Sequence, residues 1–195
     1  MREAEFTWRD GERTIHFRAG VVSDSAAILA EHGGFEGYEL LTTERAMGAA
    51  PLELASGSAC FHHVPPGQVH EVAARLIDGV GDGPLVALGG GRVIDVAKAI
   101  AAVRGTAVAA LPTTLSGAEM TRIHRLPPGR DPKHGLGRPE VVLADPPLMT
   151  SLREAPLRAS AMNALAHGAD CLYTPGANPV SELAALRGAK LIAKA

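Results

Sequence analysis

Hydrophobic and polar residues follow two different periods along this chain, and their succession predicts strands that alternate with helices. Leu85–Leu88 is a short apolar run typical of a strand buried on both faces. Further strands are expected at Tyr38–Thr42, Ala59–His63, Thr106–Leu111 and Val141–Leu143. In Gly67–Ile77 the apolar residues recur instead at helical spacing. This alternation implies an α/β fold, a parallel sheet with helices on its faces.

Turn and capping residues predict the remaining elements. Asp10-Gly11, a pair suited to a type I′ turn, predicts a hairpin over Phe6–Phe17. Ser23 is expected to cap the helix that follows it. Glu44–Leu54 is expected to be one helix despite an internal proline, and Leu126–Pro139, rich in Pro, Gly and charge, is expected to be a loop.

The last quarter of the chain differs from the rest in composition and in the secondary structure that it predicts. From Pro156 onward it reads as helix rich in Ala and Leu, interrupted at Tyr173–Pro179. We therefore expect an α/β domain over residues 1–153 and the beginning of an all-helical domain over residues 154–195. The apolar face of the last helix needs a partner, which is the sheet domain, a second copy in a homodimer, or more chain. We expect that more chain follows Ala195.

Composition excludes several classes of protein. The 195 residues carry a net charge of −2, with a pI near 6.4, so there is no basic footprint for nucleic acid. No apolar stretch is long enough to span a bilayer, and the N-terminus lacks the apolar core of a signal peptide. Cys60 and Cys171 are too few for a disulfide framework. A cytoplasmic protein with a small-molecule partner, and without a nucleic-acid or membrane partner, is expected.

Gly89-Gly90-Gly91 stands between the strand at Leu85–Leu88 and an apolar helix. Glycines let backbone N–H groups approach a phosphate, and a helix N-terminus favours its negative charge. The same glycines are equally compatible with a tight turn that needs positive φ. Asp95, expected in the first helical turn, is a candidate to cap backbone donors or to meet a ribose or an amide. Lys98 is expected to be solvated.

A second polar segment, Pro112–Thr121, follows the next strand. Thr113, Thr114 and Ser116 offer hydroxyl groups to phosphate and ribose oxygens. Ligands bind at the carboxyl ends of strands in open α/β sheets. An ordinary polar turn is the alternative.

Asn163 and His167 lie four residues apart, on one helix face, and Asp170 is placed to orient the imidazole. The pair suits a substrate, a metal, or a polar contact between domains. Two residues do not fill a zinc coordination shell, so the metal signal is weak. The other histidines show no ligand spacing and are interpreted as surface or structural.

Together these segments resemble the iron-containing (group III) alcohol dehydrogenase superfamily, and within it the maleylacetate reductase branch. The matching pieces are Gly89–Lys98, Pro112–Thr121, Val142–Pro146 and Asn163–His167, in the family's order and at about its spacing. The resemblance implies a Rossmann-like dinucleotide-binding domain followed by an all-helical domain, with the active site between them. It also implies hydride transfer with NAD(H) or NADP(H).

The resemblance assigns roles by position. The cofactor-binding residues that it implies are Gly89, Gly90, Gly91, Asp95, Thr113, Thr114, Ser116 and Lys133. Among them, Gly90 and Gly91 hold the pyrophosphate, and Lys133 reaches a ribose. His167 is the implied candidate for proton delivery or carboxylate binding, and Asn163 for a polar contact with substrate.

Three departures from the family pattern shape the hypothesis. Metal-dependent relatives carry Asp where this chain has Asn163, and a neutral carboxamide binds a divalent cation less well. The maleylacetate reductase branch has the same Asn and is regarded as working without metal. Many relatives carry an Asp that selects NAD, where this chain has Thr42 and Thr43 with Arg45 close by, so NADPH is not excluded. The chain also stops about halfway through the family pattern.

The leading hypothesis is an NAD(P)H-dependent reductase that converts maleylacetate to 3-oxoadipate in the catabolism of aromatic compounds, without a required metal. A metal-dependent iron-type alcohol dehydrogenase, with His167 as a ligand, is the second hypothesis. A nucleotide-binding fragment without turnover is the third.

Overall fold

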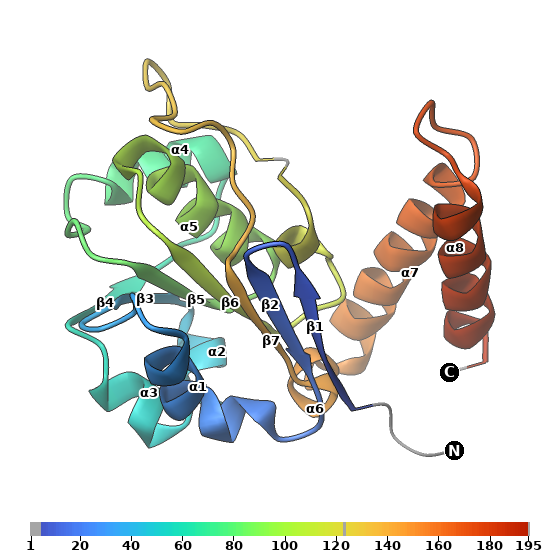
Figure 1. The fold of residues 1–195 in the computed structure, drawn as a ribbon, viewed down its shortest axis with the longest axis horizontal. Coiled ribbons are helices and arrows are strands. Elements are labelled where there is room, and N and C mark those ends of the chain that lie inside the picture. The colour runs from blue at the N-terminus through green and yellow to red at the C-terminus, as the bar shows by residue number, and fades with distance from the viewer. Residues whose placement is uncertain (1–4, 123, 195) are drawn as a thin grey trace. The chain divides into compact units, whose positions relative to one another are not determined.

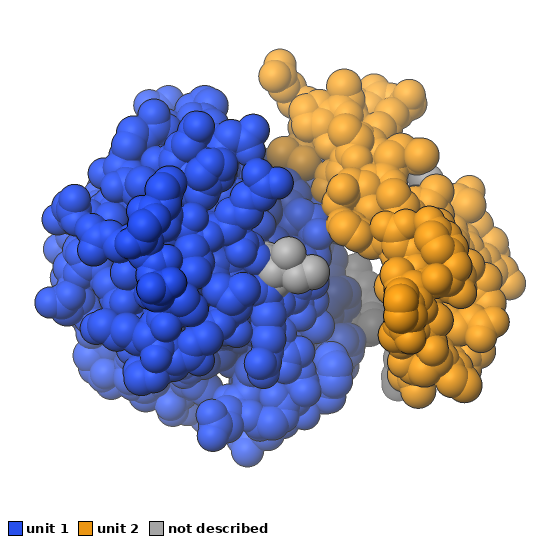
Figure 2. Space-filling model, turned by 90° about the horizontal axis from the view of Figure 1, so that it is seen from above, with its two compact units in different colours: residues 1–151 blue, residues 152–195 orange. Residues whose placement is uncertain are grey.

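The computed structural model describes residues 5–122 and 124–194, and the chain divides into two compact units, 1–151 and 152–195 (Figure 2). The sequence placed the division after residue 153. Within the part of the chain that is described, no helix combines the length and apolar character needed to cross a membrane.

The first unit is built on a seven-stranded sheet in the order β1-β2-β7-β6-β5-β3-β4. The strands are β1 Phe6–Asp10, β2 Arg13–Phe17, β3 Glu39–Thr42, β4 Cys60–His63, β5 Leu85–Gly89, β6 Val108–Pro112 and β7 Val141–Ala144. All neighbouring pairs are parallel except the predicted β1–β2 hairpin, whose two-residue loop is Gly11-Glu12. Only Gly11 of this loop has positive φ, 65°, so the turn is not the predicted type I′, which needs positive φ at both central residues. The predicted α/β class with a parallel sheet is confirmed.

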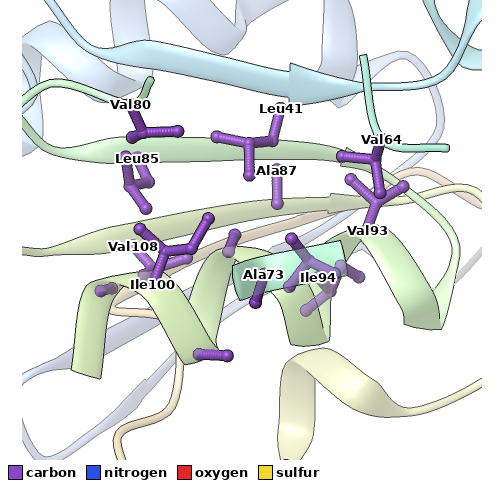
Figure 3. Close-up of a cluster of buried hydrophobic side chains, with 14 of the residues drawn as sticks. Leu41, Val64, Ala73, Val80, Leu85, Ala87, Val93, Ile94, Ile100 and Val108 are labelled. Carbon is purple, nitrogen blue, oxygen red and sulfur yellow. The ribbon is translucent and has the colours of Figure 1, made fainter. Parts of the chain in front are cut away.

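Helices cover both faces of this sheet (Figure 1). They are η1 Val21–Asp24, α1 Ser25–His32, α2 Glu44–Met47, α3 Leu52–Ser56, α4 Val69–Leu76, α5 Gly91–Arg104, η2 Ala118–Met120 and α6 Pro146–Met149. Successive strand residues point to opposite faces. Thus Leu41 and Ala87 pack with α4 and α5, whereas Leu40 and Val86 pack with α1, α2 and α3. Figure 3 shows the first of these two cores, in which Ile94 and Ile100 of α5 lie against β5.

Two local predictions are wrong. Glu44–Leu54 is broken into α2 and α3, because Pro51 at the N-cap of α3 lacks the N–H that a continuous helix needs. Ser23 does not cap α1, because it lies inside the 3₁₀ turn η1 and Asp24 holds the N-cap position without a side-chain bond.

The strand order reverses between β3 and β5. The chain leaves β3 through α2, which belongs to one face, and leaves β5 through α5, which belongs to the other. In open α/β sheets such a reversal places a ligand site outside the carboxyl ends of the two strands. The glycine turn after β5 lies at this point.

The second unit is a pair of helices, α7 Glu154–Asp170 and α8 Pro179–Ile192. Asn178 and Ser181 form a capping box, and Pro179 occupies the first turn of α8, so the start of this helix is well specified. Leu183, Leu186 and Leu191 of α8 are exposed within the described chain.

Candidate functional site

The glycine turn does not need left-handed backbone. β5 ends at Gly89, Gly90 is the N-cap of α5, and Gly91 is its first residue. Gly90 has φ −79° and ψ −175°, an extended conformation that any residue adopts. None of the three glycines has positive φ. The interpretation of this motif as a turn that requires positive φ is therefore wrong.

Close packing is what requires glycine here. A Cβ on Gly90 would lie 2.8 Å from Thr114 Cγ2, and a Cβ on Gly91 would lie 2.9 Å from Ser116 Oγ. A Cβ on Gly89 would lie 2.5 Å from Val93 Cγ2. The missing side chains thus let the loop after β6 lie directly against the N-terminus of α5.

The N-terminus of α5 is open to an anion. No side chain caps the helix, and its first turn holds no acidic residue. The early N–H groups of a helix and its dipole attract negative charge. Beside them, Thr114 Oγ1 is buried and has no hydrogen-bond partner among the described residues. The Thr114 hydroxyl, the positive end of the α5 dipole and the side-chain-free glycine turn therefore lie together.

Thr113 links the loop after β6 to the end of β5 and to Arg45. It is fully buried, and its N–H donates to Gly89 O at 3.0 Å. Its Oγ1 accepts a hydrogen bond from Arg45 Nη2 at 2.8 Å. The structure thus brings Thr113, Thr114 and Ser116 together with the glycine turn.

A pair of substitutions tests the packing. Gly91→Ala is expected to lower the free energy of unfolding by about 1–2 kcal/mol, although Ala is normally favoured in a helix, because the new Cβ meets Ser116. Ser116→Gly in the same chain is expected to restore most of the loss. Urea denaturation of the two single variants and the double variant gives the coupling directly. A stabilised Gly91→Ala variant would show that the loop yields.

The position of Asp95 in α5 and the exposure of Lys98 both differ from what the sequence predicted. Asp95 lies beyond the first turn of α5 and caps no backbone group, because its carboxylate accepts from Lys98 Nζ at 2.8 Å. Lys98 is 2% exposed, not solvated, and also donates to Ala118 O at 2.9 Å. Burial raises the pKa of Asp95, and Lys98 opposes that shift. Lys98 thereby fastens η2 to α5.

Two further buried charged residues, Glu119 and Arg13, form a cluster with Lys98 that was not predicted from the sequence, in which Glu119 interacts with both cations. Glu119 is 6% exposed, and burial raises the pKa of its carboxyl group. Arg13 on β2 donates to Glu119 O at 2.9 Å and to Pro139 O at 2.8 Å. The only sequence signal was local, a lysine three residues after an aspartate on an apolar helix.

His124 lies in the same electrostatic environment. Burial, and secondarily the charge of Lys98, lower the pKa of its imidazole to about 4. Both ring nitrogens are buried and have no hydrogen-bond partner among the described residues. The ring is therefore neutral at pH 7.

The lowered pKa of His124 predicts acid sensitivity. The pKa of the His124 imidazole is lower in the folded protein than in the unfolded chain. Its contribution to the stability of the fold is therefore complete above pH 6.5 and is lost as the pH falls towards 4. For a half-buried ring we expect a loss of about 1–2 kcal/mol between pH 7 and pH 4. The raised pKa values of Asp95 and Glu119 act in the opposite direction, since their contribution is lost as the pH rises.

A comparison of the wild type with His124→Gln isolates the contribution of the imidazole to acid sensitivity, because the Asp95 and Glu119 carboxyl groups are present in both proteins. Urea unfolding at pH 7 and pH 4.5 should show a smaller acid loss in the variant. Equal losses would contradict the assignment.

Lys133 is not brought together with the glycine turn. Its Nζ donates to Arg104 O at 2.7 Å and its N–H to Ala102 O at 2.8 Å. Arg104 is the last residue of α5, whereas the glycine turn precedes the first turn. Fourteen residues of helix separate the two sites, about 20 Å along the axis. The contact of Lys133 with a ribose has no support from these contacts.

Asn163 and His167 lie on α7 of the second unit, where both are exposed within the described chain. Asp170 accepts a hydrogen bond from the Tyr173 hydroxyl at 2.7 Å. The described residues contain no group of three or more His, Cys, Asp or Glu side chains that could hold a metal ion. The roles of Asn163 and His167 remain predictions.

The fold and this loop geometry define an α/β domain with a glycine turn at the reversal of strand order. The sequence model of the iron-containing alcohol dehydrogenase family matches residues 13–146. This chain belongs to the iron-containing alcohol dehydrogenase family.

Its similar proteins include several maleylacetate reductases. Maleylacetate reductase 2 of Cupriavidus pinatubonensis is 39% identical over 153 residues, which are 73% of this chain and 42% of that protein. The Burkholderia cepacia maleylacetate reductase is 32% identical over 93% of this chain and 54% of its own length. A crystal structure of maleylacetate reductase from Agrobacterium tumefaciens superposes with a TM-score of 0.78 at 27% identity, over 99% of this chain and 57% of that one. The chain therefore spans about half the length of these relatives.

Proposed function

We propose that the glycine turn and the loop after β6 bind a nicotinamide dinucleotide. The observation that carries this proposal is the side-chain-free approach of Gly90 and Gly91 to Thr114 and Ser116, at an uncapped helix N-terminus. A pyrophosphate fits such a place, because backbone N–H groups can reach it and the helix dipole favours its charge. The unpartnered Thr114 Oγ1 would supply a donor to a phosphate or ribose oxygen.

The reaction we propose is that of a maleylacetate reductase, the reduction of maleylacetate to 3-oxoadipate. When bound, the dinucleotide supplies a hydride to an electron-poor carbon–carbon double bond conjugated to a carbonyl group. The chain's own residues then have to orient the nucleotide, hold the substrate and deliver one proton. Support comes from the similarity to maleylacetate reductases over most of this chain.

Within this proposal, His167 delivers the proton or binds a substrate carboxylate, and Asn163 makes a polar contact with the substrate. Both lie on one face of α7, four residues apart. We further propose that no metal is required, because Asn163 offers a neutral carboxamide where a metal site favours an anionic ligand. A homodimer is the proposed assembly.

One assay tests the proposal. The protein is mixed with NADH or NADPH, and absorbance at 340 nm is followed with and without maleylacetate, before and after chelation with EDTA. Oxidation that depends on maleylacetate and survives chelation is the expected result. Loss of turnover on chelation, with recovery on adding iron or zinc, would favour the metal-dependent alcohol dehydrogenase. Nucleotide binding without turnover on any substrate would favour the non-catalytic alternative.

A further inference from the structure

The reversal of strand order brings the residues after β3 beside the glycine turn, and their chemistry bears on which dinucleotide binds. β3 and β5 are hydrogen-bonded neighbours, with Thr42 opposite Leu88. Their connections depart to opposite faces of the sheet. In sheets of this kind, the end of the strand beside the phosphate turn meets the ribose that carries the adenine. Residues 43–45 occupy that place here.

Arg45 is fixed at this edge of the sheet. Its Nη2 donates to Thr113 Oγ1 at 2.8 Å, although the two residues are 68 positions apart. Thr113 is in turn bound to Gly89 through its N–H. Since β5 lies between β3 and β6, the Arg45 side chain reaches across the strand that carries the glycine turn.

The charge of Arg45 is not neutralised locally. Its recorded partner is a neutral hydroxyl, and no carboxylate of residues 5–122 or 124–194 lies within 4.0 Å of its guanidinium nitrogens. A guanidinium has five N–H donors, and one hydrogen bond leaves the others for an anion. Thr42 is fully buried, and the Thr43 hydroxyl caps α2 by accepting from Ala46 N. Neither threonine offers the carboxylate that would accept from a ribose hydroxyl.

We propose that Arg45 recognises a phosphate on the 2′ position of the adenosine ribose, so that this chain prefers NADP(H) to NAD(H). The inference rests on the proposed binding of a dinucleotide at the glycine turn. A guanidinium matches a phosphate through two parallel N–H···O bonds, and it retains its charge at every working pH. The hydrogen bond to Thr113 orients the group before the nucleotide arrives, which lowers the entropy lost on binding.

Binding measurements test the inference without any need for turnover. Titrations of the protein with NADPH and NADH, followed by nucleotide fluorescence, are expected to give a Kd for NADPH at least about tenfold lower. Isothermal titration with 2′,5′-ADP and 5′-AMP isolates the 2′-phosphate and is expected to show the same order. Arg45→Gln is expected to raise the Kd for NADPH about 10- to 100-fold and to change that for NADH less than about twofold.

Matched variants separate recognition from structural effects. Arg92→Gln removes one positive charge from the exposed start of α5 and should leave the NADPH:NADH ratio unchanged. Thr113→Val removes the hydrogen-bond partner of Arg45 and should weaken the binding of NADPH more than that of NADH. Arg45→Lys keeps the positive charge and should retain part of the preference for NADPH. Glu44→Gln removes the neighbouring exposed carboxylate, which on this proposal does not select the nucleotide, so the NADPH:NADH ratio should stay unchanged.

Two results would overturn the inference while leaving the proposed function intact. One is equal or tighter binding of NADH by the wild type. The other is an equal loss of both nucleotides in Arg45→Gln, which would make Arg45 a structural residue only. If neither nucleotide binds the wild type, the proposed function itself fails, and the inference fails with it.

Discussion

Lys98→Met is expected to lower the free energy of unfolding by about 2–3 kcal/mol, below the range for a fully buried ion pair. The Lys98 side chain is 1% exposed, and its Nζ joins the Asp95 carboxylate to the Ala118 carbonyl. The substitution leaves the Asp95 carboxylate, which is 26% exposed, without its partner, and it leaves the Ala118 carbonyl without the Lys98 donor. Urea denaturation at pH 7, monitored by circular dichroism, measures the change.

The same substitution at Lys133 provides the control. Lys133 also bonds to a backbone carbonyl, but it is exposed, so Lys133→Met should change stability by no more than about 0.5 kcal/mol. Adding Asp95→Leu to Lys98→Met should recover part of the loss, because the unpaired carboxylate is then gone. A loss below about 1 kcal/mol in Lys98→Met would mean that the cluster is better hydrated than its burial indicates.

His167→Ala is expected to lower kcat for maleylacetate about 10²- to 10⁴-fold, the usual contribution of a positioned acid or base. The reason is the proposed delivery of a proton by this imidazole, which alanine cannot perform. Added imidazole should restore part of the turnover, and the loss should be smaller at acidic pH, where solvent supplies the proton more readily.

His63→Ala, an exposed histidine on β4, is the matched control and should keep kcat within about twofold. If His167→Ala instead raises KM with kcat unchanged, the side chain binds the substrate carboxylate. Product formation at the wild-type rate and KM would remove His167 from the mechanism altogether.

The sheet could be predicted from the sequence because each strand carries its own signal. Leu85–Gly89 and Val108–Pro112 are continuous apolar runs, and the structure buries all ten of these residues. Burial on both faces needs no information from elsewhere in the chain. The hairpin at Gly11 was equally local.

The charged cluster could not be predicted, because its contacts join distant segments. Arg13 meets the backbone of Glu119 across 106 positions, and Lys98 meets Ala118 across 20. A lysine in sequence is by default solvated, and only the approach of η2 makes burial possible here. The reason for the glycines was hidden in the same way, since the atoms that exclude a Cβ on Gly90 belong to Thr114.

The position of β2 has a consequence for how the chain folds. Thr14 on β2 pairs with Val141 on β7, so an early strand acquires its inner neighbour only after nearly the whole first unit has been made. At a synthesis rate of about 5–20 residues per second, the β1–β2 hairpin waits on the order of ten seconds with an unpaired edge. Long-range pairing of this kind slows folding and exposes strand edges to other chains. The inner edge of β2 thus needs protection in the nascent chain, and pairing with β7 ends its exposure, whereas β1 stays an edge strand of the finished sheet.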